Sequence, residues 1–295
     1  MLPSPSSPIL FSIGSFSLRW YSLCLLAGVL TALWFALKRA KKIGIHEDHI
    51  YNISFWAVFM GLVGARVFAV LYEPAYYFSH PLEIPQVWNG GLAIHGGVVF
   101  AAITIAVYCW VKKPLMGNTT NSKITNGSAG TLGGRVAIRP YGMFDLLVPS
   151  LLIGQIIGRF GNYFNQEAYG TPTSLPWGIH IDPQNRYSEY MEFSTYHPTF
   201  LYEALWNLLV LFILLKIEKK YLQKKPQTPD FRLQTSPGRL TAFYFIFYGI
   251  GRGLLEFIRT DASWWGPMRV VHWLSIGLII GGTIFLLIKK PKVRQ

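Results

Sequence analysis

Seven long apolar stretches constrain this chain more than any other feature, because each is about as long as a membrane is thick. A helix needs about 20 mostly apolar residues to cross a hydrocarbon layer of about 30 Å. The apolar stretches, of which the fourth is the weakest, occupy residues 16–37, 51–72, 92–111, 141–157, 199–215, 240–258 and 270–288. With 51% hydrophobic and 14% charged residues among 295, the sequence predicts an all-α polytopic membrane protein with about seven transmembrane helices.

The basic residues predict the orientation of these helices, since cytoplasmic loops of membrane proteins are enriched in Lys and Arg. Twenty of the 27 Lys and Arg residues follow the first, third, fifth or seventh apolar stretch. This pattern places the N-terminus outside and the C-terminus in the cytoplasm. The net charge of +13 would then face anionic headgroups, so we expect membrane lipids as partners and no nucleic acid.

Three polar segments interrupt what we interpret as a single membrane domain, residues 1–295. Residues 116–134 are rich in Gly, Ser, Thr and Asn and predict a flexible cytoplasmic insert, and residues 221–237 predict a flexible cytoplasmic loop. Residues 163–196 differ, because they contain Trp177, several tyrosines and proline turn signals. We expect them to fold as a small periplasmic cap.

Polar side chains gather near the outer ends of the predicted helices, where ionisable residues are costly and by default indicate a site. They are Tyr21, Arg66, His95, Arg159, Asn162, His197, Glu203, Arg252 and Glu256. Arg252 and Glu256 are four residues apart and share a helix face, so they can pair or point into one cavity. Arginines at headgroup depth suit a phosphate, because the guanidinium group is a planar fork of donors that stays charged.

Each of these residues also has a purely structural interpretation. Arg66 and Glu256 could form an ion pair between helices, and His95 could be a packing histidine that donates to a backbone carbonyl. His197 could be a helix-entry residue, and Tyr21 an interfacial aromatic anchor. Their gathering at one depth, rather than any one of them, favours a site.

Four motifs allow a more specific interpretation. They are His95-Gly-Gly, Gly158-Arg-Phe-Gly-Asn-Tyr-Phe-Asn-Gln-Glu167 with Gly170, His197-Pro-Thr-Phe-Leu-Tyr-Glu203, and Gly249-Ile-Gly-Arg252 with Glu256 and Arg259. Together they closely resemble the prolipoprotein diacylglyceryl transferase family of the bacterial inner membrane. The resemblance implies that the diacylglyceryl group of phosphatidylglycerol is moved to the lipobox cysteine of a prolipoprotein signal peptide, with release of glycerol phosphate and an active site toward the periplasm.

The resemblance also implies roles for individual residues. The catalytic candidates are His95, Arg159, Arg252 and Glu256, and the substrate-binding candidates are Tyr21, Asn162, Glu167, Gly170, His197, Glu203, Tyr248 and Arg259. Arg159 and Arg252 would hold the phosphate and its developing charge. His95 is the candidate base for the thiol, because the ordinary pKa of histidine suits proton transfer near neutrality, and Glu167 or Glu256 are the alternatives. We expect no metal and no cofactor, since the arginines supply positive charge.

Two other function classes remain open. A transporter or lipid-binding protein would also place Arg and Glu within membrane helices, although its polar residues should continue across the bilayer. Another headgroup enzyme, such as a lipid phosphatase or an intramembrane protease, would need a nucleophile, zinc or phosphate-loop motif, and none is present in the sequence. The products discriminate between these classes: lipidated peptide, free phosphate or neither.

Overall fold

The computed structural model describes residues 5, 7–14, 16–112, 140–223, 238–260 and 264–288. The predicted insert at 116–134 lies outside these residues, and so does nearly all of the predicted loop at 221–237. The first three residues of that loop are helical in the structure, so its start was predicted too early. The helix that precedes it runs on because apolar and long side chains continue beyond the stretch counted as membrane-spanning.

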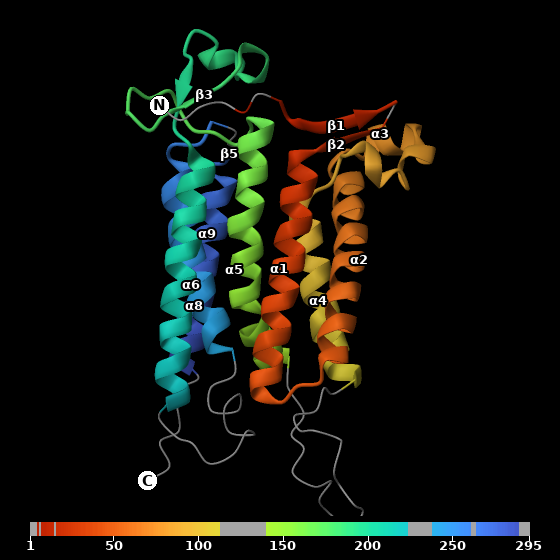
Figure 1. Ribbon diagram of the computed structural model, residues 1–295, viewed down its shortest axis with the longest axis vertical. Helices are drawn as coiled ribbons and strands as arrows, with labels where there is room; N and C mark the ends of the chain where they lie inside the picture. Colours follow the sequence, from red (N-terminus) through yellow and green to blue (C-terminus); the bar gives the residue numbers. More distant parts are fainter. Residues whose placement is uncertain are drawn as a thin grey trace, which may run out of the picture. The chain divides into compact units, whose positions relative to one another are not determined.

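Long helices make up most of the described chain (Figure 1). They are α1 (Trp20–Ile43), α2 (Glu47–Tyr72), α4 (Ile94–Lys112), α5 (Pro140–Asn165), α6 (Thr199–Gln223), α8 (Arg239–Glu256) and α9 (Val270–Ile288). Among the described residues, six of these are long and apolar enough to cross a membrane, and α8 is not one of the six. Charged residues at both ends of α8, Arg239, Arg252 and Glu256, lower its mean hydropathy. The structure therefore confirms a mostly helical protein with several candidate membrane spans.

Several of the predicted apolar stretches differ at their ends from the helices that carry them. Residues 16–19 form strand β2 (Phe16–Arg19), which pairs antiparallel with β1 (Ile9–Ile13), so α1 begins only at Trp20. The backbone turns sharply between the two strands, where Gly14 has φ +59°. The weakest predicted helix, 141–157, belongs to a longer one, because α5 continues to Asn165 and carries the polar Arg159 block on its last turns.

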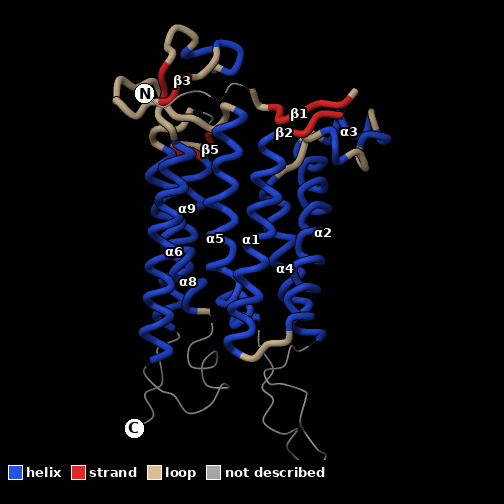
Figure 2. The backbone as a smooth tube through the Cα atoms, viewed as in Figure 1, coloured by secondary structure: helices blue, strands red, loops and turns tan. Residues whose placement is uncertain are grey.

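The strands are short and lie at or beyond the ends of the long helices of unit 1 (Figure 2). Besides β1 and β2, strand β3 (Ile179–His180) pairs with β4 (Thr195–Tyr196), and β5 (Trp264–Trp265) pairs with β6 (Met268–Arg269). Short helices α3 (Pro74–Ser79), η1 (Pro81–Glu83) and η2 (Val87–Asn89) connect α2 to α4. Each two-stranded ribbon pairs backbone N–H and C=O groups of segments that lie outside the helices.

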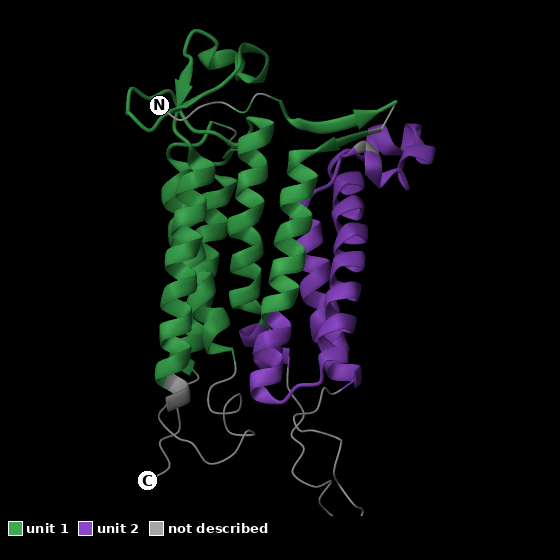
Figure 3. Cartoon of the chain, viewed as in Figure 1, with its two compact units in different colours: residues 1–35, 147–226, 238–295 green, residues 36–146, 227–237 purple. Residues whose placement is uncertain are grey.

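The chain divides into two compact units (Figure 3). Unit 1 comprises residues 1–35, 147–226 and 238–295. Within it, α8 packs against both α6 and α9, and the core contains Leu152 of α5, Leu214 of α6 and Tyr244 of α8. Gly28 of α1 lies against Gly154 of α5, where a Cβ on Gly28 would come within 3.1 Å of the Gly154 carbonyl oxygen. Small residues of this kind let helix backbones approach closely.

Unit 2 comprises residues 36–146 and 227–237 and is built around the packing of α2 against α4. Glycines face one another across this pair. A Cβ on Gly64 would lie 2.6 Å from the Gly96 carbonyl oxygen, and one on Gly97 would lie 3.3 Å from that of Gly61. The glycine pair that follows His95 therefore serves close helix packing.

Residues 166–196, between α5 and α6, pack around a small core in unit 1 that also includes Phe200 of α6. It contains Tyr169, Ile179, Ile181 and Tyr196, which are all almost completely buried. The Tyr169 hydroxyl donates to the Asn185 carbonyl and accepts from the Tyr187 amide, each at 2.8 Å, and burial raises the pKa of Tyr169 to about 12. The segment is folded over much of the predicted cap, although its first residues, 163–165, still belong to α5.

Candidate functional site

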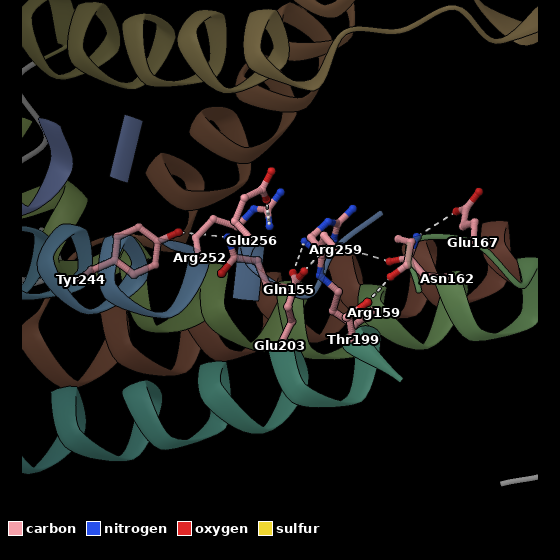
Figure 4. Close-up of polar contacts among 11 residues, drawn as sticks. Gln155, Arg159, Asn162, Glu167, Thr199, Glu203, Tyr244, Arg252, Glu256 and Arg259 are labelled. Atoms are coloured by element: carbon pink, nitrogen blue, oxygen red, sulfur yellow. Dashed lines mark hydrogen bonds and ion pairs between the residues drawn. The ribbon is translucent and has the colours of Figure 1, made fainter. Parts of the chain in front are cut away.

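Charged side chains meet at one end of unit 1 (Figure 4). The last turns of α5 contribute Arg159 and Asn162, and the first turns of α6 contribute Glu203. The C-terminal end of α8 contributes Arg252 and Glu256. Antiparallel helices bring these positions together, because α5 and α8 end where α6 begins.

Glu203 joins two arginines and is the centre of the cluster. Its Oε2 lies 2.7 Å from Nη2 of Arg159, and its Oε1 lies 2.8 Å from Nη1 of Arg259. The Glu203 and Arg259 side chains are 7% and 8% exposed, whereas that of Arg159 is 28% exposed. The carboxylate thus neutralises a buried guanidinium group on one side and orients a more accessible one on the other.

Arg252 and Glu256 form the ion pair that their spacing predicts, with Nη1 and Oε2 2.8 Å apart. These two atoms are buried, and their contact is not aligned as a hydrogen bond. Glu256 is 1% exposed. The two side chains meet because residues four apart lie about one turn apart on the same face of α8.

Asn162 links Arg159 to Glu167. Its Oδ1 accepts from Arg159 Nη1 at 3.2 Å, and its Nδ2 donates to Glu167 Oε1 at 2.8 Å. Glu167 is exposed beyond the end of α5. Tyr21, at the start of α1, packs its ring against Gly161 of the same block, where a Cβ would lie 2.8 Å from Cδ2 of the ring.

Gly170 lies where three segments of unit 1 meet. Its amide donates to the His197 carbonyl at 2.9 Å, and the next amide, of Thr171, donates to the Ile258 carbonyl at 2.7 Å. A Cβ on Gly170 would lie 2.7 Å from the Ile258 oxygen, 2.9 Å from His197 Cβ and 3.0 Å from Thr199 Cγ2. Close approach of backbones, and not a left-handed turn, is what this glycine provides.

Gly170→Ala should therefore destabilise the protein by about 1–3 kcal/mol, because the added methyl group has no space between two backbones. The substitution should also lower activity, since Ile258 precedes Arg259. Thermal unfolding in detergent measures the first effect. Gly277→Ala is the matched control, because nothing lies within 4 Å of a Cβ at Gly277 in α9. Equal unfolding temperatures for the two variants would contradict the argument.

His197 and Tyr202 form a separate hydrogen-bonded pair at the start of α6. His197 Nδ1 lies 3.1 Å from the Tyr202 hydroxyl, which also accepts from Nε1 of Trp177 at 2.9 Å. Partial burial lowers the pKa of His197, because it disfavours the charged imidazolium. These contacts describe a helix-entry histidine held by its neighbours.

The other candidates lie on α8 or in unit 2. Tyr248 stacks on Tyr244 within α8, at 5.5 Å between ring centroids. His95 is the second residue of α4 and is exposed, and Arg66 lies in the last third of α2 and is buried. Both belong to unit 2.

Arg159 and Arg252 both have N–H donors that contact no protein acceptor among the described residues. A guanidinium group has five N–H donors. Arg159 contacts only Asn162 and Glu203, and Arg252 contacts only Glu256, among the residues that the structure describes. Both therefore retain N–H groups for an anion, in a site where charges are partly shielded from water. Arrangements of this kind can bind a phosphate and stabilise charge that develops on its oxygens. In the described part of the chain, no group of three His, Cys, Asp or Glu side chains could hold a metal ion.

Two contributions to the site escape sequence analysis. Arg269 Nη1 donates to the carbonyls of Glu256 and Arg259, the latter at 3.1 Å, and so binds the end of α8. Gln155 Nε2 donates to the buried Tyr244 hydroxyl at 2.9 Å and joins α5 to α8. In neither case are the donor and its acceptor neighbours in the sequence. The one local signal is that Gln155 and Arg159 are four residues apart and therefore share a face of α5.

Comparisons with known proteins identify relatives along both units. A family model described as prolipoprotein diacylglyceryl transferase matches residues 8–138 and 124–288. The phosphatidylglycerol–prolipoprotein diacylglyceryl transferase of Thermotoga petrophila is 37% identical over 287 residues, which are 97% of this chain and 86% of that protein. Proteins of the same name from Streptococcus agalactiae and Staphylococcus saprophyticus are each 33% identical, and cover 96% and 97% of this chain and 96% and 90% of their own lengths.

Proposed function

Because this chain belongs to the prolipoprotein diacylglyceryl transferase family, we propose that it moves the diacylglyceryl group of phosphatidylglycerol to the cysteine thiol of a prolipoprotein. The product carries a thioether, glycerol phosphate is released, and the reaction is the first step of bacterial lipoprotein maturation. The observation that carries this conclusion is the match to relatives of that name over nearly the whole chain. The cluster of partly unpaired arginines agrees with a phosphate-bearing substrate.

The reaction divides into three changes at the substrate. The thiol gives up its proton, the sulfur bonds to the glyceryl carbon, and the bond from that carbon to the phosphate oxygen breaks. The electron pair of the broken bond stays on the phosphate, which gains negative charge. Arg159 and Arg252 stabilise that charge through the N–H groups that their protein partners leave available.

The proton acceptor is His95 in this proposal. A thiol with an ordinary pKa of about 8.5 is mostly protonated near neutrality, so it needs a base. Glu256 is less suited than His95, because it is buried and already paired with Arg252. Glu167 is exposed and accepts from Asn162, which supports a role in orienting Arg159. Tyr21 and Asn162 line the same end of α5, and Glu203, Arg259, Gly170 and His197 hold that end in place.

The membrane arrangement is also part of the proposal. We place the protein in the bacterial inner membrane with seven spans, because α8 packs against both α6 and α9 and overlaps the sixth predicted stretch, 240–258. The distribution of basic residues supports an external N-terminus and a cytoplasmic C-terminus. In that orientation the arginine cluster and residues 166–196 face the periplasm, and the acceptor peptides bring their lipobox cysteine there.

A transfer assay tests the function directly. Phosphatidylglycerol labelled in its diacylglyceryl group is reconstituted in liposomes with the purified protein and a lipobox peptide. The labelled group should appear on the peptide, together with an equal amount of glycerol phosphate, and should be absent from a peptide with Cys→Ser. Free phosphate in place of lipidated peptide would identify a phosphatase. Intact phosphatidylglycerol with a folded protein would move the assignment to lipid binding or transport.

A further inference from the structure

Arg66 holds the connection between α2 and α4 through both of its terminal nitrogens. Nη1 donates to the Tyr77 hydroxyl and to the Gly91 carbonyl, each at 2.9 Å. Nη2 donates to the Glu83 carbonyl at 3.4 Å and to the Gln86 carbonyl. The guanidinium carbon also lies 5.4 Å from the centre of the Tyr77 ring. The four terminal N–H groups thus face four protein oxygens, and only Nε remains, which is buried without a hydrogen-bond partner among the described residues.

The segment that Arg66 holds leads directly into the first turn of α4. Gly91 has φ +64°, and a Cβ there would lie 2.6 Å from the Tyr77 hydroxyl oxygen and 3.0 Å from Arg66 Nη1. Two residues later, the Ala93 amide donates to the Ala65 carbonyl of α2 at 3.0 Å. His95 follows as the second residue of α4. The backbone before His95 is therefore fastened to α2 at two successive points.

We propose that Arg66 is a positioning residue for the transfer reaction, which holds the start of α4 and thereby the imidazole of His95, and that it does not bind the lipid phosphate. This inference rests on the proposed function and on His95 as the base. It separates Arg66 from Arg159 and Arg252, whose guanidinium groups retain donors. All four terminal N–H groups of Arg66 face protein oxygens and the residue is 6% exposed, so none of these four groups is available to a ligand.

Lysine cannot take over this role although it keeps the charge. Its ammonium group offers three donors from a single point, whereas the oxygens of Tyr77, Gly91, Glu83 and Gln86 are arranged around the planar fork of a guanidinium group. A loss on Arg66→Lys therefore reports geometry and not charge. If Arg66 acted only by its positive charge, the lysine variant would keep most of the activity.

The test compares steady-state transfer by the full-length protein in liposomes for the parent, Arg66→Lys, His95→Gln and the double variant. Arg66→Lys should lower kcat on the order of 10²-fold, the loss that follows from misplacing a reacting group by about 1 Å. The KM for phosphatidylglycerol should stay unchanged. In the His95→Gln background, Arg66→Lys should lower kcat by less than about twofold, because both substitutions remove the same contribution.

Arg39→Lys is the matched control, since Arg39 is also a buried arginine of unit 2 that donates to backbone carbonyls, those of Leu146 and Asp145. It should lower the unfolding temperature without the loss of kcat that depends on His95. If Arg66→Lys does not fold, Tyr77→Phe takes its place in the test, because it removes one acceptor of the Arg66 guanidinium group. It should lower kcat about tenfold, and this decrease should also depend on His95. A wild-type kcat in the deciding variant would overturn the proposal.

Three further results would also overturn it while leaving the transferase function intact. A higher KM for phosphatidylglycerol with an unchanged kcat would show that Arg66 binds lipid. If the double variant lost kcat by the product of the two single-variant factors, Arg66 would act independently of His95. Full transfer activity in the His95→Gln variant would show that the reaction does not need the imidazole that Arg66 is proposed to position. Failure of the parent itself to transfer label would instead contradict the proposed function.

Discussion

Arg159→Ala should lower kcat for diacylglyceryl transfer by about 10²–10³-fold, the usual effect of removing one preorganised donor from developing negative charge. Arg159 is the most accessible arginine of the cluster, and it retains N–H groups beyond those that contact Asn162 and Glu203. The fold should survive, because Glu203 keeps its ion pair with the buried Arg259. The labelled transfer assay measures the loss, and thermal unfolding confirms that the variant is folded.

Arg19→Ala is the matched control for this prediction. Arg19 is an exposed arginine of β2, in the same unit as Arg159. Its removal changes the net charge by the same amount, so it reports any general effect of charge on lipid or peptide binding. Similar kcat values for the two variants would show that Arg159 does not act on the phosphate. A loss confined to KM would limit Arg159 to ground-state binding.

Glu203→Gln should be the most destabilising single substitution in the site, at about 3 kcal/mol. The neutral amide would leave the guanidinium groups of Arg159 and Arg259 close together without the carboxylate that lies between them. Arg259 is the more affected of the two, because it is buried. Transfer should fall as well, since Arg159 would lose the contact that orients its fork. Thermal unfolding in detergent and the transfer assay measure the two effects on the same preparation.

Glu192→Gln provides the comparison for Glu203→Gln, because Glu192 is exposed in the segment between α5 and α6. Exposed substitutions of this kind usually change stability by less than about 0.5 kcal/mol. If both variants unfolded at the same temperature, the two arginines would not depend on the carboxylate. The ion pairs of Glu203 would then be incidental to the fold.

The features that the sequence predicts most accurately are those whose physical signal is local. The last predicted apolar stretch, 270–288, coincides with α9, and the first six overlap the helices that carry them. The pairing of Arg252 with Glu256 was also predictable, because four residues span about one helical turn. The ends of the helices were predicted less accurately than their existence. The strand before α1 has apolar residues like those of a membrane helix, and hydrophobicity alone does not distinguish the two.

The helix α8 shows why function can obscure a fold signal. Arg252 and Glu256 are candidate site residues, and the same charges lower the hydropathy by which a membrane helix is recognised. A polar residue in such a helix is retained only where protein partners offset its burial. Within α8, Arg252 and Glu256 offset one another. Just beyond α8, Arg259 takes its partner, Glu203, from another helix, and that pairing depends on packing and leaves no trace in the local sequence.

The sequence by itself determined that this chain forms apolar helices, and its motifs identified the family together with most of the candidate residues. Only the tertiary structure decided which partner each charged group takes. It placed Glu203 between Arg159 and Arg259, residues 44 and 56 positions away, and it enclosed Arg66 in the connection before α4. The physical reason is the distance along the chain over which each interaction acts. Hydrophobicity and helix period act over a few residues, whereas the pairing of buried charges depends on which helices lie side by side.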